Sequence, residues 1–253
     1  MIVLRSTRWL LPTLVLAAGA TLGCAAWWKW HDIDACTGIS PLPRFVGAAL
    51  QDIGIVRFRA ESCQDRWIAL EVYPGLRKGY FVDVGSGDGE LHSNTKVLED
   101  LGWEGVCIDP FPTNMAGRRC TLFTAPVYSV SGKRVRFHTA GVIGGIEESL
   151  GRWKGQAERA RVVELETRTL TELLAEAKAP RFIHYMSMDI EGAELEALKG
   201  LDFSRYRIGA LTIEHNFEEP KRGAILAFLE SKGYRRERSV DQDDFYVSTA
   251  KGQ

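Results

Sequence analysis

A glycine-rich loop follows a short apolar run in residues 80 to 89, which read YFVDVGSGDG. Glycine permits a positive φ and lets the backbone approach a ligand closely. A tight turn from a strand to a helix, with no ligand, would also explain the pattern. The loop by itself therefore leaves a ligand site and a plain turn both open. Its glycines are Gly85, Gly87 and Gly89.

A further acid, Asp109, ends the next apolar run, 20 residues after the last glycine of the loop. An acid at the end of the second strand of such a unit can accept hydrogen bonds from both hydroxyls of a ribose. This spacing predicts a ligand that contains an adenosine. A helix cap or a surface acid at Asp109 is the alternative.

The charge of the loop distinguishes between two cofactors that contain adenosine, a nicotinamide dinucleotide and S-adenosylmethionine. A dinucleotide site has the spacing G-x-G-x-x-G and directs a helix N-terminus at a pyrophosphate. Here the spacing is G-x-G-x-G, and the carboxylates of Asp83, Asp88 and Glu90 would repel a pyrophosphate. S-adenosylmethionine has a sulfonium and an ammonium group, which carboxylates attract. The pattern therefore favours S-adenosylmethionine over a nicotinamide cofactor.

Acids also end two later apolar runs, at Asp189 and at Glu214. The carboxyl ends of parallel strands meet at one edge of a sheet, where ligands bind. We expect Asp189 to bind a methyl acceptor or to take its proton. The alternative is a helix N-cap, with Glu191 in a first turn that favours acids.

His215 is a second candidate base, because the unperturbed pKa of histidine is about 6.5. A structural histidine at a strand end is the alternative. The predicted catalytic set is Asp189, Glu191 and His215. No metal site is predicted, although Asp189, Glu214 and His215 could instead hold a divalent ion that orients hydroxyls.

The elements that must position these residues alternate along the chain. Helices are predicted at 91–101, 170–178, 193–199 and 222–232. Strands are predicted at 80–84, 105–108, 121–124, 134–138, 161–166, 182–188 and 208–213, with a closing hairpin at 234–240 and 245–248. The alternation predicts an α/β fold with a mostly parallel sheet and helices on both faces.

The start of the chain has a different composition. Residues 9–28 contain no charge, and as a helix they would cross one bilayer core. A single-pass membrane anchor is the favoured interpretation. A signal peptide cleaved after Ala18-Gly19-Ala20, a lipoprotein site at Cys24 and a buried helix are alternatives. Arg5 and Arg8 weakly favour a cytoplasmic N-terminus, which leaves the side of the domain open.

Composition and cysteine spacing argue against two further classes of protein, nucleic-acid binders and structural zinc proteins. The net charge of −1 gives no indication of nucleic-acid binding. No C-x-x-C pair occurs, which argues against structural zinc. Cys107 is expected to be a buried free thiol, and Cys36 and Cys63 to pair if their compartment is oxidising. Three regions are predicted: a membrane or signal segment at 1–30, a linker and helical preface at 31–78, and a ligand-binding domain at 79–250.

The stretch FVDVGSGDGELHSNTKVLEDLGWEGVCIDPFP, followed by RTLTELL and SMDIEGAELEALKGL, resembles the FkbM family of S-adenosylmethionine-dependent methyltransferases over about residues 79–248. The resemblance implies a class I methyltransferase fold, a Rossmann-like sheet with one antiparallel hairpin strand. It implies O-methylation of a hydroxyl on a sugar, glycan or small metabolite. With Asp88 added from the charge pattern, the expected cofactor-binding residues are Asp83, Gly85, Gly87, Asp88, Gly89, Ser93, Asn94 and Asp109.

Two other functions stay open at this point. Some family members are single-pass, Star-like proteins that use the fold for binding or trafficking without catalysis. A nicotinamide-dependent oxidoreductase is disfavoured by the charge of the loop. Because S-adenosylmethionine is made in the cytosol, an enzyme facing the other side of a membrane would need an imported cofactor. The sequence predicts neither the acceptor nor the oligomeric state.

Overall fold

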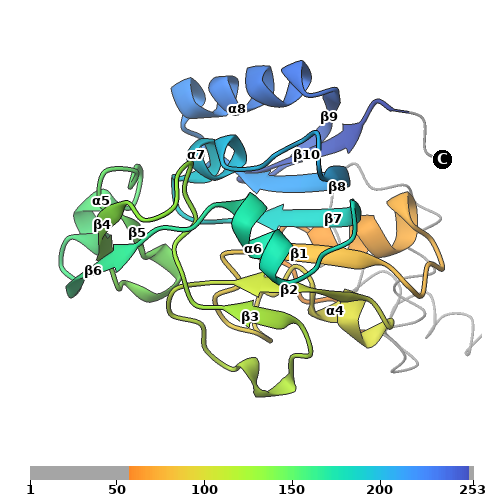
Figure 1. Ribbon diagram of the computed structural model, residues 1–253, viewed down its shortest axis with the longest axis horizontal. Coiled ribbons are helices and arrows are strands. Elements are labelled where there is room, and N and C mark those ends of the chain that lie inside the picture. The colour runs from red at the N-terminus through yellow and green to blue at the C-terminus, as the bar shows by residue number, and fades with distance from the viewer. Residues whose placement is uncertain (1–56, 251–253) are drawn as a thin grey trace, which may run out of the picture. The chain divides into compact units, whose positions relative to one another are not determined.

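The computed structural model describes residues 57–250, and their main element is a seven-stranded sheet in the order β3-β2-β1-β7-β8-β10-β9 (Figure 1). The first five strands in this order are parallel, and β10 pairs antiparallel with both of its neighbours. This confirms the predicted mostly parallel sheet with a C-terminal antiparallel hairpin. The strands are β1 (Tyr80–Val84), β2 (Glu104–Ile108), β3 (Thr121–Phe123), β7 (Phe182–Met188), β8 (Arg207–Glu214), β9 (Tyr234–Val240) and β10 (Asp243–Ser248).

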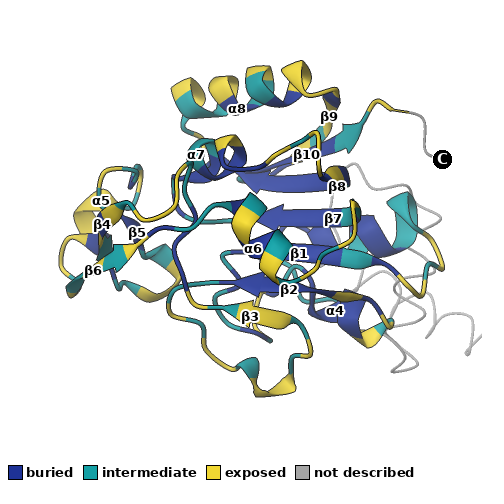
Figure 2. Cartoon of the chain, in the orientation of Figure 1, coloured by how far each residue is buried: buried dark blue, intermediate teal, exposed yellow. Residues whose placement is uncertain are grey.

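Helices cover both faces of this sheet, as predicted. One face packs against α6 (Leu170–Glu176), α7 (Glu194–Lys199) and α8 (Glu219–Ser231), and the other against α3 (Gln64–Trp67), the π-helix η2 (Ile68–Val72) and α4 (Lys96–Asp100). Figure 2 shows the central strands β1, β2, β7 and β8 largely in the dark blue of buried residues. Strands buried on both faces must be apolar along their whole length, which is why they could be located from sequence.

A second, three-stranded sheet has the order β5-β4-β6 and is antiparallel. It contains β4 (Arg134–His138), β5 (Gly145–Ile146) and β6 (Val162–Glu166), and the short helices η4 (Gly141–Ile143) and α5 (Lys154–Ala157) lie in the same region. It lies beyond the carboxyl ends of β7 and β8 in Figure 1. A Cβ added at Gly145 would lie 3.4 Å from the Cβ of Glu191, so this sheet contacts the edge where the site is expected.

The predicted helix at 91–101 is wrong in its first half. Helix α4 begins at Lys96, and Leu91 is 64% exposed instead of packing on the sheet. The hydroxyl of Ser93 accepts hydrogen bonds from the backbone N–H of Thr95 and of Lys96, at 3.4 and 3.1 Å. These hydrogen bonds hold the residues before Lys96 in a turn, so the helix begins only after it.

The predicted free thiol at Cys107 is also wrong, because Cys107 forms a disulfide with Cys120. The parallel pairing of β2 with β3 places Val106 opposite Thr121, which brings the residue before β3 beside Cys107. Cys63 is disulfide-bonded as well. The predicted partner, Cys36, lies outside the described residues.

The predicted membrane segment at 9–28 also lies outside the described residues. Within residues 57–250, no helix combines the length and the apolar character needed to cross a bilayer. The described part of the predicted preface contains α3 and η2, whose Trp67 and Ile68 are fully buried against the sheet.

Candidate active site

The three glycines of the loop have different surroundings. A Cβ at Gly85 would lie 1.7 Å from the carbonyl oxygen of Asp189, and one at Gly89 would lie 2.8 Å from the carbonyl oxygen of Asn114. Both glycines therefore permit close packing of backbone on backbone. Gly87 has a φ of +45°, and a Cβ there would meet only the Gly85 carbonyl oxygen, at 3.9 Å. Gly87 is thus the glycine beside which a ligand has room.

Asp109 lies directly beside Gly87. Its Oδ2 accepts a hydrogen bond from the Gly87 N–H at 2.9 Å, and its Oδ1 accepts one from the Phe111 N–H at 2.7 Å. Burial raises the pKa of Asp109, and these two hydrogen bonds oppose that rise. Each carboxylate oxygen has a second lone pair, so Asp109 can still accept from the two hydroxyls of a ribose.

The side chains of Asp88, Ser93 and Asn94 form hydrogen bonds that hold the loop and the segment after it. Asp88 Oδ1 accepts from the N–H groups of Glu90 and Leu91, at 2.9 and 2.8 Å, which lowers its pKa. Asn94 Nδ2 donates to the hydroxyl of Ser187 in β7 at 2.9 Å. Ser93 accepts from the backbone N–H groups of Thr95 and Lys96, just before α4 and at its first residue. The three residues thus fix the turn that the glycines allow.

Asp83 lies at the end of β1, directly before the loop, and is 3% exposed. The hydroxyl of Thr95 donates to its Oδ2 at 2.5 Å, and Arg118 Nη1 lies 4.0 Å from the same oxygen. Burial raises the pKa of Asp83, whereas the charge of Arg118 and the Thr95 hydrogen bond lower it. Arg118 and Thr95 thus favour the ionised form of Asp83, which is the form that can attract an ammonium group.

Three carboxylates converge at the carboxyl ends of β7 and β8: Asp189, Glu191 and Glu214. Their nearest carboxylate oxygens all lie within 4.8 Å of one another. Glu191 is 8% exposed and Glu214 is 6% exposed. Because Gly85 touches the backbone of Asp189, the glycine loop and this carboxylate cluster are immediate neighbours.

The carboxylate cluster holds at least one proton near neutral pH. Burial raises the pKa of all three groups, and the mutual repulsion of the carboxylates raises the pKa of Glu191 and Glu214 further. The rise is largest at Glu214, which is hydrogen-bonded to Asp189. Like charges this close cannot all be ionised without a cation between them. The cluster can therefore accept a proton from a substrate, hold a cation, or both.

The backbone around the cluster is in the left-handed region. Glu191 has a φ of 57°, Asn216 of 48° and Phe217 of 60°. Non-glycine residues rarely adopt these angles, which cost about 1–3 kcal/mol each and concentrate at functional sites. Sequence periodicity does not report φ, so the sequence did not show that the chain turns Glu191 back toward Glu214.

Asn216 also belongs to the site, although no pattern in the sequence predicted it. Its Nδ2 donates to Glu191 Oε2 at 3.0 Å and to Glu214 Oε2 at 2.6 Å, which ties the two side chains together. Its place in the Glu214-His215-Asn216 strand end was the available signal. Asp243, which pairs with Glu214 across β8 and β10, is a further buried acid, and burial raises its pKa to about 7.

His215 does not face the cluster. Its Nδ1 accepts from the Phe217 N–H at 3.0 Å, and its Nε2 lies 3.7 Å from Asp244 Oδ1. Burial lowers the pKa of His215, which is 3% exposed. Neighbouring residues in a strand point to opposite faces, so Glu214 and His215 cannot both face one site. The three side chains that could hold a divalent ion are therefore Asp189, Glu191 and Glu214, with Glu191 in place of the predicted His215.

These groups together can position a cationic cofactor beside a proton acceptor. The group of side chains that could hold a metal ion within residues 57–250 is this carboxylate cluster. All of its ligand atoms are oxygens, which suit Mg²⁺ or Ca²⁺ better than zinc.

Comparison with known proteins identifies the family. A family model described as the methyltransferase FkbM domain matches residues 83–236, a range that contains the loop, Asp109 and the carboxylate cluster. Searches of curated proteins and of solved structures found no match. The chain belongs to the FkbM methyltransferase family, and its domain is that of an S-adenosylmethionine-dependent methyltransferase.

Proposed function

We propose that the enzyme transfers a methyl group from S-adenosylmethionine, bound at the glycine loop and Asp109, to a hydroxyl of a sugar, glycan or small metabolite. The contact between Gly85 and the backbone of Asp189 supports this most directly, since it places a cofactor loop against a cluster that can take a proton. The open space at Gly87 and the buried acid at Asp83 fit a cationic, adenosine-containing cofactor.

The residues have separate tasks in this proposal. The cofactor supplies an activated methyl group. The Asp109 carboxylate binds its ribose, and Asp83 attracts its ammonium group. Asp189 would accept a hydrogen bond from the acceptor hydroxyl and take its proton as the oxygen–carbon bond forms and the carbon–sulfur bond of the sulfonium breaks. Such proton transfer contributes about 10²–10⁴ to a rate, and alignment of the two reactants contributes more.

Glu191, Glu214 and Asn216 support Asp189 in this task. Protonated Glu214 can donate its hydrogen bond to Asp189, which leaves Asp189 as the ionised member of the pair. Asn216 holds Glu191 and Glu214 in fixed positions. The proton taken from the acceptor would then stay on Asp189, and the cluster would carry one negative charge less until that proton leaves to water.

The test is transfer of a labelled methyl group from S-adenosylmethionine to pooled glycans and hydroxylated metabolites. We expect label that survives mild alkali, because a methyl ether is stable there and a methyl ester is hydrolysed. The matched control is the Asp189→Asn enzyme. Label that alkali releases completely would contradict a hydroxyl acceptor.

The same cluster could hold a divalent cation through its three carboxylates. We propose that the reaction needs only the proton site. Dialysis against a chelator should then leave at least about half of the activity, since proton transfer at Asp189 needs no metal. Loss of activity that Mg²⁺ restores would contradict this and assign the cluster to a metal.

We also propose that residues 9–28 anchor the chain in a membrane and that the domain lies on its oxidising side. The Cys107–Cys120 disulfide and the disulfide at Cys63 support this, because disulfides persist in oxidising compartments. Protease added to the cytosolic side of intact vesicles should therefore leave the domain and its C-terminus undigested. A domain digested from the cytosolic side would contradict the proposal.

A further inference from the structure

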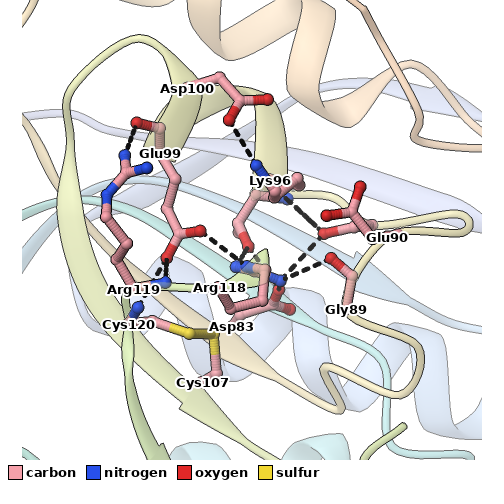
Figure 3. A network of polar contacts seen from close by, with 12 residues as sticks. Asp83, Gly89, Glu90, Lys96, Glu99, Asp100, Cys107, Arg118, Arg119 and Cys120 are labelled. Carbon is pink, nitrogen blue, oxygen red and sulfur yellow. Dashed lines mark hydrogen bonds and ion pairs between the residues drawn. A yellow bond between two sulfur atoms is a disulfide. The ribbon is translucent and has the colours of Figure 1, made fainter. Parts of the chain in front are cut away.

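The positively charged side chain of Arg118 contacts the cofactor loop, and no motif of the sequence singles this residue out. It lies in the connection between β2 and β3, yet its side chain is only 1% exposed. Figure 3 shows it at the centre of a network of polar contacts. A fully buried guanidinium is costly unless every donor has a partner, so its contacts indicate what it does.

Arg118 reaches three parts of the cofactor site from behind the loop. Its Nη1 donates to the carbonyl oxygen of Gly89 and to the hydroxyl of Ser93, both at 3.3 Å. Its Nη2 donates to the hydroxyl of Thr95 at 2.7 Å, and Thr95 in turn donates to Asp83. One side chain thus joins the last glycine of the loop, the turn that precedes α4, and the acid near the end of β1.

Arg118 itself is held by α4. Its Nε donates to Glu99 Oε2 at 2.9 Å, and the buried Glu99 is 1% exposed in its side chain. The other oxygen of Glu99 accepts from the backbone N–H groups of Arg119 and Cys120, at 3.0 and 2.7 Å. Glu99 therefore fixes both the guanidinium and the backbone beside it.

The Cys107–Cys120 disulfide fixes the same segment from the other side. It joins the residue two places after Arg118 to the interior of β2, across a sequence separation of 13 residues. The connection also packs tightly on the loop, since a Cβ at Gly117 would lie 2.8 Å from Glu90 Oε1. The disulfide, Glu99 and this packing together leave Arg118 little freedom to move away from the loop.

We propose that Arg118 is a positioning residue for the cofactor loop, and that Glu99 and the Cys107–Cys120 disulfide keep it in place. This rests on the cofactor site proposed above. Arg118 sets the position of the Gly89 backbone and of Asp83, and its charge compensates that of Asp83. It lies on the face that α4 covers, over the ring of Phe81, and does not enter the acceptor side of the site.

A role in positioning the cofactor has a kinetic signature. Loss of Arg118 should weaken binding of S-adenosylmethionine and leave the chemical step, which depends on Asp189, unchanged. An effect on KM for the cofactor with kcat retained at saturation separates this role from a general loss of folded protein.

The test compares Arg118→Met, Arg118→Lys and the Cys107→Ala/Cys120→Ala double variant in the full chain. Calorimetry gives Kd for S-adenosylmethionine, and turnover gives KM and kcat. We expect Arg118→Met to raise Kd and KM at least about tenfold, as loss of hydrogen bonds to a charged group predicts, with kcat within about twofold. Arg118→Lys should recover part of the affinity, and the double variant should raise Kd in the same direction.

Leu229→Ala is the matched control, because it removes a buried side chain of α8 on the opposite face of the sheet. It should lower the unfolding temperature and leave Kd unchanged. Folded Arg118→Lys and double variants with wild-type Kd would overturn the inference even if Arg118→Met fails to fold. A rise in Kd for Leu229→Ala as large as theirs would also overturn it. Wild-type protein that binds no S-adenosylmethionine would refute the proposed cofactor site itself.

Discussion

At the scale of single residues, Asp189 is the group on which turnover should depend most. Asp189→Asn keeps the size of the side chain and removes its ability to take a proton. We expect kcat to fall by about 10²-fold or more, with Kd for S-adenosylmethionine changed by less than about threefold. Glu230→Gln, which removes an exposed acid of α8, is the control. An Asp189→Asn enzyme with wild-type kcat would exclude Asp189 as the base.

The protonation of the cluster should appear in the pH profile of kcat. Burial and mutual repulsion raise the pKa values of its carboxyls, so the proton-accepting form increases as the pH rises. We expect kcat to rise with pH through the neutral range instead of levelling off near the ordinary carboxyl pKa of about 4. Glu214→Leu should move this rise to higher pH, because it removes the hydrogen bond that lowers the pKa of Asp189. A flat profile from about pH 5 would contradict the role of the cluster.

At the scale of elements, the disulfide between β2 and the start of β3 should contribute to stability as well as to cofactor binding. Closing a loop of this size removes conformational freedom from the unfolded chain and stabilises the fold by about 3 kcal/mol. Thermal unfolding of the Cys107→Ala/Cys120→Ala variant should show a loss of about 6–12 °C. An unchanged unfolding temperature would show that Glu99 alone is sufficient to hold the connection.

The elements differ in how far the sequence predicts them. The strands β1 and β7 have the predicted bounds, because short, mostly apolar runs between polar ends are typical of buried strands. Helix α4 is shorter than predicted, because Ser93 competes with the helix for backbone N–H groups. The site residues that the sequence predicted are those that directly follow a strand, such as Asp109 and Asp189. Arg118 was missed because its partner Glu99 is 19 residues away along the chain, and charges in a loop normally face water.

At the scale of the whole molecule, several buried acids should make the protein more stable at mildly acidic pH. Burial raises the pKa of Asp65 to about 6 and that of Asp243 to about 7. An acid whose pKa is raised by folding binds more protons in the folded state. Its contribution to the free energy of unfolding is fully present below the pKa that the group has in the unfolded chain. This contribution is lost as the pH rises through the pKa that the group has in the folded protein.

We therefore expect the free energy of unfolding of the cofactor-free protein to fall between about pH 4 and about pH 7. Asp243→Asn should reduce this fall, because the amide does not titrate. Denaturant titrations at a series of pH values measure it. Stability that rises over this range would show that these acids are ionised and paired in the folded protein. Bound S-adenosylmethionine, as a cation among acids, should make the dependence weaker.

The most direct test of the function is a calorimetric titration of S-adenosylmethionine into the full chain and into Asp109→Ala and Asp109→Asn variants. We predict binding to the wild type with a Kd in the micromolar range, weakened at least about tenfold by Asp109→Ala. Asp109→Asn should lie between the two, since its amide oxygen can still accept one of the hydrogen bonds that Asp109 receives from Gly87 and Phe111. Folded wild-type protein that binds no S-adenosylmethionine, or binding that neither substitution at Asp109 changes, would contradict the cofactor site described here.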